Sequence, residues 1–325
     1  MKEEEIRPAN IFDEYLRLAK QDTETYFRDA ITTPCDCPAC GKRGVFAFLK
    51  HGFAYDNCPA CHSLFVSPRP AAIAFSKYYT ESPSSTYWAT TFYKETAAAR
   101  KEKLWRPKAR LVLDLLEHFN AADYTIIDIG GGYGLFAEEI LEMSGHSPLV
   151  IEPGPALAES CREKKLPVIE KFLEQVLPAE LPAGPKVFVS FELFEHLHDP
   201  QAFLCHLKQL MGNGDFFMFT TLSSLGLDIQ VLWDASKSVS PPHHLNFFNP
   251  GAIRILLERA GFETLEVTTP GKLDIDILCN NRSGIHDRFW KSFVETATEE
   301  EKSEWQKTIA MTGRSSHMMV ICRNT

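Results

Sequence analysis

The sequence contains no long hydrophobic run. No apolar stretch in its 325 residues approaches the ~18 to 20 residues that a membrane-spanning helix needs. The first residues, Met1-Lys2-Glu3-Glu4-Glu5, are acidic and lack the apolar segment that follows in a signal peptide. We therefore expect a cytoplasmic protein without a membrane partner.

Basic residues are also few relative to acidic ones. The chain has 34 Lys and Arg against 43 Asp and Glu, which gives a formal net charge of −9. Proteins that bind nucleic acid usually present a clustered basic face to the phosphates. The basic run at residues 100–103 is short and interrupted by an acid, which is typical of a solvated helix face. The charge balance therefore argues against a nucleic-acid partner.

A glycine-rich turn follows a β-branched run in the middle of the chain. Residues 125–129 are mostly apolar, residues 130–134 contain four glycines, and residues 135–141 resume with helical spacing. This order predicts a buried strand, a tight turn and a helix start, as in the first unit of a doubly wound α/β sheet. The dinucleotide motif G-x-G-x-x-G is absent, because Leu135 stands where its third glycine would fall.

Two acids accompany this turn. Asp128 precedes Gly130, Gly132 and Gly134 in the pattern D-x-G-x-G-x-G, and Glu152 ends the next apolar run. This arrangement resembles the cofactor loop of the class I methyltransferases that use S-adenosylmethionine (SAM). The resemblance implies that these five residues bind SAM, with Glu152 on the ribose hydroxyls.

Two C-P-x-C motifs lie near the amino terminus. Cys37 and Cys40 form the first motif, Cys58 and Cys61 form the second, and seventeen residues separate them. This spacing is typical of a zinc ribbon, in which four thiolates surround Zn²⁺ tetrahedrally. Because four cysteines leave no open position, the expected zinc is structural. A redox role for the paired cysteines is the competing interpretation, and Cys35 is a surplus thiol.

The chain divides around these motifs. We expect a helical extension over residues 1–34, the zinc ribbon over 35–70, an aromatic-rich helical connector over 71–120 and a SAM-dependent methyltransferase domain over 121–325, with an insertion at 271–316. From residue 125 onward, strand and helix patterns alternate. Strands are expected near residues 125–129, 148–152, 167–169, 186–191, 215–221, 263–269 and 317–323. Helices are expected near residues 134–143, 155–165, 172–177, 200–211, 250–260 and 285–310. The predicted fold is α/β, and the resemblance implies a Rossmann-like sheet of seven strands.

A second group of motifs follows the expected fourth strand. Glu192, Glu195 and His196 belong to the pattern E-x-x-E-H-x-x-D-P, and His244 begins the later pattern H-L-x-F-F. Ligands of open α/β sheets lie beyond the carboxyl ends of the strands. Both patterns look like elements of a methyltransferase subfamily that includes the ubiquinone-pathway O-methyltransferases. The first pattern also resembles the metal site of small-RNA 2′-O-methyltransferases.

Three roles are open for these four residues. Together they could hold Mg²⁺, which would position a substrate hydroxyl and lower its pKa. Alternatively, His196 or His244 removes the hydroxyl proton directly as a general base. In the third interpretation, Glu195 and His196 brace the following helix and His244 pairs with backbone groups.

Nearly the whole chain resembles methyltransferases that carry an amino-terminal zinc ribbon. The resemblance implies SAM-dependent methyl transfer to a small polar acceptor, most simply to oxygen of a sugar or of a carrier-linked metabolite. RNA methylation and a non-catalytic adaptor or SAM-binding protein are the alternatives. The expected cofactors are SAM and structural Zn²⁺, with Mg²⁺ as an open addition, and the expected partner is a small-molecule substrate.

Overall fold

A seven-stranded mixed sheet forms the centre of the computed structural model, which describes residues 2–325. Its strand order is β12-β13-β10-β9-β6-β7-β8. All strands run parallel except β13, which lies antiparallel between β10 and β12. The strands are β6 (Thr125–Ile129), β7 (Leu149–Ile151), β8 (Val168–Ile169), β9 (Lys186–Ser190), β10 (Phe216–Leu222), β12 (Phe262–Thr268) and β13 (His317–Asn324). The predicted Rossmann-like sheet of seven strands is confirmed.

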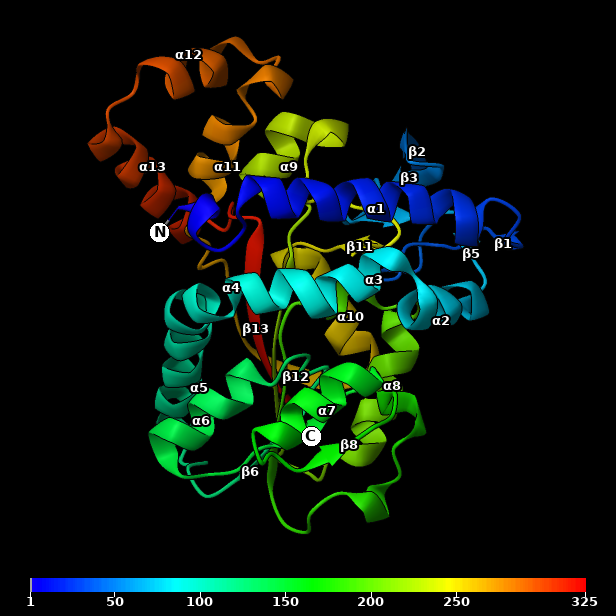
Figure 1. Cartoon of the computed structure of the whole chain (residues 1–325), viewed down its shortest axis with the longest axis vertical. Helices are drawn as coiled ribbons and strands as arrows, with labels where there is room; N and C mark the ends of the chain where they lie inside the picture. The colour runs from blue at the N-terminus through cyan, green and yellow to red at the C-terminus, as the bar shows by residue number, and fades with distance from the viewer. Residues whose placement is uncertain (1) are drawn as a thin grey trace.

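Helices cover both faces of this sheet, so its central strands are buried on both sides (Figure 1). They include α6 (Leu135–Ser144), α7 (Pro155–Glu163), α8 (Pro200–Leu210) and α10 (Pro250–Arg259). Two of them begin at a polar cap followed by proline: Asp199 accepts a hydrogen bond from the Ala202 N–H, and Asn249 accepts from two backbone N–H groups. Such caps satisfy backbone donors that have no partner inside the helix.

The helix expected near residues 172–177 is not formed. Two 3₁₀ turns, Leu173–Gln175 and Pro178–Glu180, take its place. The prediction was wrong because Pro178 disfavours helical backbone in the residue before it, and Leu177 is extended.

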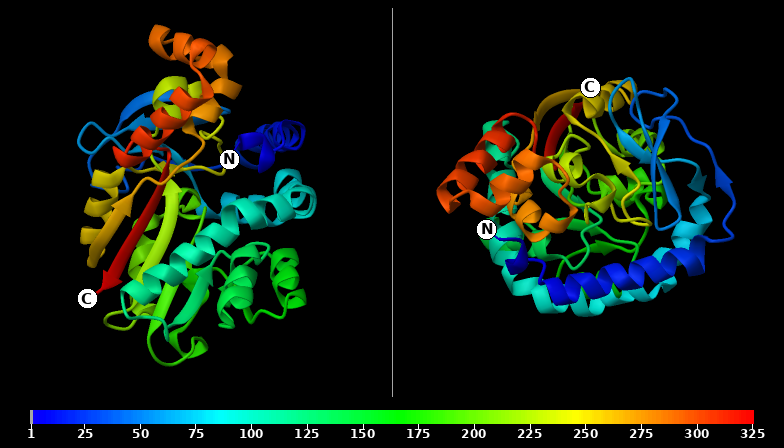
Figure 2. Two further views of the ribbon diagram at one scale, coloured as in Figure 1. Left: turned by 90° about the vertical axis from the view of Figure 1, so that its left-hand side faces the viewer. Right: turned by 90° about the horizontal axis from the view of Figure 1, so that it is seen from above.

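The connector is a short helix followed, after a break at the extended residue Ser82, by a long helix that contains two π-turns. It consists of α2 (Ala72–Glu81), α3 (Pro83–Tyr87), the π-turn η2 (Trp88–Phe92), α4 (Tyr93–Arg100), the π-turn η3 (Lys101–Trp105) and α5 (Arg106–His118). Pro107 is the second residue after the second π-turn; it lacks the N–H that a regular helix needs, and the wider turn before it accommodates this loss. The amino-terminal helix α1 (Ala9–Phe27) lies alongside these helices (Figures 1 and 2).

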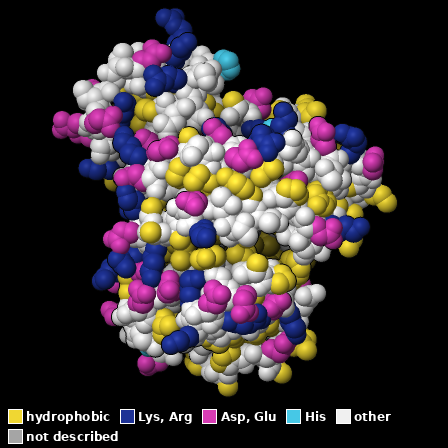
Figure 3. Space-filling view, viewed as in Figure 1, with side chains coloured by type: hydrophobic (Ala, Val, Ile, Leu, Met, Phe, Trp, Pro, Cys, Tyr) yellow, Lys and Arg dark blue, Asp and Glu magenta, His cyan; other side chains and the backbone are white. Residues whose placement is uncertain are grey.

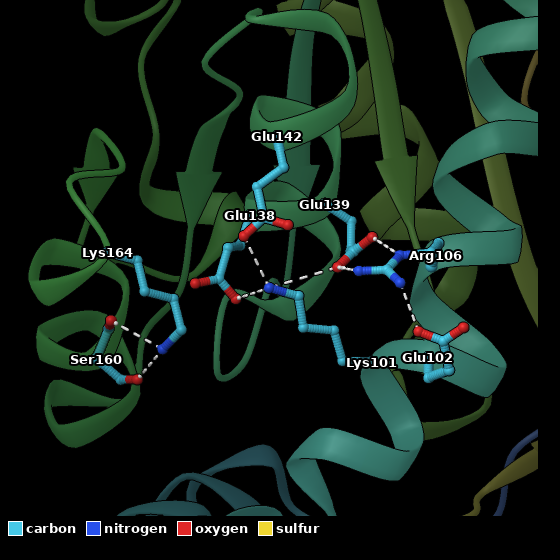
Figure 4. Close-up of polar contacts among 8 residues, drawn as sticks. All are labelled: Lys101, Glu102, Arg106, Glu138, Glu139, Glu142, Ser160 and Lys164. Carbon is cyan, nitrogen blue, oxygen red and sulfur yellow. Dashed lines mark hydrogen bonds and ion pairs between the residues drawn. The ribbon is translucent and has the colours of Figure 1, made fainter.

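Ion pairs anchor the connector to the sheet layer (Figure 4). Lys101 and Arg106 face α6, where Arg106 Nε lies 2.9 Å from a carboxylate oxygen of Glu139. The Lys101 ammonium reaches Glu138, Glu139 and Glu142 at 2.9 to 3.4 Å. The Glu139 side chain is only 1% exposed, so Arg106 and Lys101 compensate a negative charge that is shielded from water.

The cysteine-rich segment forms a second sheet with an unexpected member. Strands β2 (Val45–Lys50), β3 (Phe53–Asn57) and β4 (Leu64–Val66) pair in sequence, and β11 (Asn246–Phe247) adds to β4. The short strands β1 (Thr32–Thr33) and β5 (Arg69–Pro70) form a separate pair. Since β11 belongs to the H-L-x-F-F element, the ribbon sheet is continuous with a motif nearly two hundred residues later.

Residues 271–316 are largely helical. They contain α11 (Asp274–Asn280), α12 (Arg288–Thr296) and α13 (Glu299–Met311), which lie at one end of the molecule beside α9 (Leu227–Leu232) (Figure 1). The single helix expected near residues 285–310 is two helices, because Thr298 and Glu301 form a capping box that starts α13. No helix within residues 2–325 is long and apolar enough to cross a membrane.

Candidate functional site

The glycine loop connects the end of β6 to α6. Gly130, Gly132 and Gly134 all have positive φ, from 55° to 75°, which side chains with a Cβ rarely adopt. Gly131 is restricted differently, because a Cβ there would lie 2.6 Å from a methyl group of Val150. The loop therefore requires glycine at each of these positions, and it brings bare backbone to the amino end of α6.

The two predicted acids lie beside this loop. The carboxylate of Glu152 accepts hydrogen bonds from the backbone N–H groups of Gly132, at 2.9 Å, and Gly154, at 2.8 Å. Asp128 is 2% exposed, and its Oδ2 has no hydrogen-bond partner among residues 2–325. Burial and the nearby charge of Glu152 raise the pKa of Asp128 to about 7. An unpaired buried acceptor beside a glycine loop fits a ligand that donates hydroxyl protons, as the ribose of SAM does.

Aromatic side chains form the other walls of the pocket above the loop. The lining includes Trp105, Phe136 and Phe191 together with Tyr93 and Tyr133. The rings of Tyr93 and Tyr133 stack, with centroids 5.7 Å apart and planes at 10°. Tyr93 belongs to the aromatic-rich connector, but the sequence pointed to Tyr78 and Tyr79 as the connector residues that cover the cofactor, and these two do not line this pocket. Tyr93 brings α4 over the glycine loop.

The four predicted zinc ligands come together. The Sγ atoms of Cys37, Cys40, Cys58 and Cys61 lie within 4.8 Å of one another, and the closest pairs are 3.4 Å apart. Tetrahedral coordination with Zn–S bonds of about 2.3 Å requires thiolates about 3.8 Å apart. The cluster could therefore hold zinc after small shifts. Cys35 lies outside it, with its Sγ 3.3 Å from the Val66 carbonyl oxygen.

The later motifs meet at the carboxyl end of β9. Ligand atoms of Glu195, His196 and His244 lie within 4.8 Å of one another. Glu192 is not a member of this trio: its carboxylate lies 3.4 Å from Lys108 Nζ and 3.6 Å from His317 Nδ1. Burial alone would raise the pKa of Glu192, but the charge of Lys108 holds it well below its usual range. Three of the four predicted residues are thus adjacent.

Both histidines of the trio are half-buried and neutral. Burial lowers the pKa of His244 to about 4, and burial together with His244 lowers that of His196 well below its usual value. The Nδ1 atom of His244 lies 2.6 Å from the carbonyl oxygen of Ser238. Because a carbonyl can only accept, Nδ1 carries the proton and Nε2 keeps a free lone pair. His244 can therefore accept a proton or bind a metal through Nε2.

Tyrosines from the extension and the connector surround these histidines. His243 is buried between Tyr15 Oη, 2.9 Å from its Nδ1, and Tyr78 Oη, 2.7 Å from its Nε2. Tyr79 Oη lies 3.5 Å from His196 Nδ1. No local pattern could have found Tyr15, which is far from the motifs in sequence.

Comparisons with known proteins identify the family of the chain. A family model described as "Methyltransferase domain" matches residues 98–267, more than half of the chain. No curated protein matches. Among solved structures, the plantazolicin methyltransferase BamL in complex with a triazolic desmethylPZN analog and SAH has 11% identity and a TM-score of 0.50, over 77% of this chain and 95% of that one.

Two further structures are similar at a lower level. One is a chain of the complex between the Haloferax volcanii Trm112 methyltransferase activator and a methyltransferase, with 14% identity, coverage of 73% and 95%, and a TM-score of 0.48. The other is magnesium protoporphyrin IX methyltransferase from Synechocystis PCC 6803 with bound SAH, with 10% identity, coverage of 74% and 97%, and a TM-score of 0.46. On the family match, the chain belongs to the methyltransferase-domain family and is a SAM-dependent methyltransferase.

Proposed function

We propose that this enzyme methylates an oxygen atom of a small polar acceptor, either a sugar or a carrier-linked metabolite. The observation that carries the proposal is the geometry of His244, which is half-buried and hydrogen-bonded through Nδ1 to the Ser238 carbonyl oxygen, so that Nε2 keeps the lone pair that can accept a proton. A base of this kind is needed when the acceptor is an alcohol.

Asp128, Glu152 and the glycine loop are the residues that would hold SAM, which supplies a methyl group activated on a sulfonium. His244 Nε2 would take the proton of the acceptor hydroxyl as that oxygen is methylated. His196 and Tyr79 border the acceptor, and the aromatic walls exclude water. General-base catalysis typically contributes about 10²- to 10⁴-fold in rate.

The donor set favours this direct role over Mg²⁺. Two imidazole nitrogens and one carboxylate oxygen are not the oxygen-rich octahedral set that Mg²⁺ prefers. Glu192, the second carboxylate of the motif, is engaged by Lys108 and His317 instead. A catalytic Mg²⁺ would have to compete with both partners.

We also propose that residues 35–70 are a zinc ribbon of the subfamily named above and that its zinc is structural. The ribbon supports the catalytic loops: Arg69 donates to Asn246 Oδ1 at 2.8 Å and also to the His198 carbonyl oxygen. Folding of the ribbon around zinc would thus fix the loops that carry His196 and His244.

The test is release of labelled methyl from SAM to a panel of hydroxylated sugars, carrier-linked metabolites and small RNAs, with calorimetry of SAM and SAH binding alongside. We expect turnover on a small acceptor, and we expect this turnover to persist in the presence of EDTA. Turnover on RNA alone would replace the acceptor class, and SAM binding without turnover on any acceptor would favour the non-catalytic adaptor. Loss of turnover in EDTA that Mg²⁺ restores would favour a metal.

A further inference from the structure

A second cavity, separate from the glycine-loop pocket, is lined by basic residues. It has a volume of about 370 Å³ and lies between α1, the turn that joins β2 to β3, and the loop before His243. Its basic side chains come from three separate segments and are Arg17, Lys20, Lys50, His51 and Lys237. Asp13 is the one carboxylate among the residues that line it.

The cations of this cavity are only partly neutralised. Asp13 pairs with Lys237 at 2.6 Å, and Glu14 pairs with Arg17 at 2.7 Å. Lys50 Nζ donates to the Ser236 carbonyl oxygen at 2.7 Å, which leaves its positive charge unpaired. Lys20 has neither an ion pair nor a side-chain hydrogen bond in the described part of the chain. The cavity thus has an excess of positive charge in a protein whose formal net charge is −9.

The face of the molecule seen in Figure 3 does not share this excess. The face that carries α1 shows acidic and basic side chains interspersed (Figure 3). Within the cavity, burial lowers the pKa of Lys50 to about 8, because the loss of water outweighs the attraction of the Asp234 carboxylate, with which Lys50 forms no ion pair in the described residues. A bound anion would restore that lost stabilisation.

The cavity wall and the proposed base belong to the same loop. Val239 and Ser240 line the cavity, and the Ser240 carbonyl oxygen accepts the His244 backbone N–H at 3.0 Å. The neighbouring Ser238 carbonyl oxygen holds His244 Nδ1. On the opposite wall, Leu16 lines the cavity next to Tyr15, which contacts His243. A group bound in the cavity would therefore contact the loop that carries His244.

We propose that this cavity binds the phosphate or diphosphate group of the methyl acceptor, so that the acceptor is a phosphorylated small molecule. The proposal rests on the proposed function for the identity of the ligand as an acceptor. Several lysines match a phosphate oxyanion, which carries more charge and more acceptor oxygens than a carboxylate. The volume suits a small molecule. No Phe, Tyr or Trp of residues 2–325 lines the cavity, so recognition falls on the phosphates.

The probe is inorganic pyrophosphate, titrated calorimetrically into the full-length protein without SAM at fixed ionic strength. We expect binding to the wild type and an affinity about tenfold or more weaker for Lys20→Glu, since one unpaired cation becomes an anion. Lys307→Glu, an equal charge change on the exposed face of α13, should leave the affinity within twofold. Absence of pyrophosphate binding, or equal losses in both variants, would overturn the proposal.

Further ligands separate the phosphate from the rest of the molecule. UDP should bind like pyrophosphate and uridine should not, whereas equal binding of UDP and uridine would contradict recognition through phosphate. If pyrophosphate binding depends on Lys20 but no acceptor is methylated, the proposed function is wrong and the anion site remains. If the rate of methyl transfer changes neither with phosphorylation of the acceptor nor in Lys20→Glu, this inference is wrong and the proposed function remains.

Discussion

The imidazole ring of His244 stands edge-on to that of His196, with ring centroids 4.9 Å apart and planes at 88°. The two residues come from different segments: His196 ends the 3₁₀ turn after β9, and His244 precedes β11. A backbone hydrogen bond of 2.8 Å from Leu245 N to the Glu195 carbonyl oxygen joins these segments beside the rings. The relative position of the two side chains is therefore fixed by the main chain.

Replacing the proposed base should separate catalysis from cofactor binding. We expect His244→Asn to lower kcat by about 10²- to 10⁴-fold while the Kd for SAM stays within a factor of about two, because the side chain lies outside the glycine-loop pocket. The control is His146→Asn, an exposed histidine after α6. Full activity of His244→Asn would remove it from the reaction.

The acids at the glycine loop should control SAM affinity. Glu152→Ala removes the acceptor for two backbone N–H groups, and Asp128→Ala removes the unpaired buried oxygen. Calorimetry should detect no SAM binding to either variant, whereas the exposed Asp123→Ala should bind as the wild type does. Circular dichroism would verify the fold, and unchanged affinity in both variants would disprove the cofactor assignment.

The raised pKa of Asp128 should make stability fall with pH in the absence of SAM. Burial holds its pKa near 7, against about 3.9 in an unfolded chain, so the folded protein keeps a proton that the unfolded chain releases. The contribution is fully present below about pH 4 and is lost as the pH rises through 7. Relative to Asp128→Asn, the wild-type free energy of unfolding should drop by up to about 1.4 kcal/mol per pH unit in this range. Urea denaturation of both proteins at several pH values measures the difference, and parallel profiles would contradict it.

Metal analysis should find one zinc ion per chain. Cys58→Ser removes one of four converging thiolates, so we expect the zinc content and the melting temperature to fall. Cys35→Ser should retain the ion, because Cys35 points at a backbone carbonyl outside the cluster. Native protein that lacks zinc, or equal zinc loss in both variants, would argue against the four-cysteine site.

The connector should depend on one buried carboxylate of α6. Glu139→Gln removes the charge that faces Arg106 and Lys101, and we expect the free energy of unfolding to fall by about 1 to 3 kcal/mol. Glu142→Gln changes a carboxylate that is 51% exposed and should cost less than about 0.5 kcal/mol. Chemical denaturation compares the two, and equal effects would show that burial of Glu139 is unimportant.

The sequence was most informative where a short segment specifies its own conformation. The β-branched run and the glycines that follow it predicted β6, the loop and the start of α6, because strand burial and positive φ are local requirements. The cysteine spacing likewise predicted which four thiols converge. The incorrect prediction of a helix near residues 172–177 also has a local cause, because Pro178 disfavours helical backbone in the residue before it.

Relations between distant segments were decided by the tertiary structure. The sequence by itself determined the Rossmann-like domain, the glycine loop with its two acids, and the four-cysteine cluster. Only packing paired Glu192 with Lys108 and His317, joined β11 to the ribbon sheet and brought Tyr15 to His243. These contacts depend on how helices and sheets stack, and the spacing of residues along the chain does not specify which distant side chains meet. The tertiary structure thus separated Glu192 from the histidine pair and gathered the basic cavity from three segments.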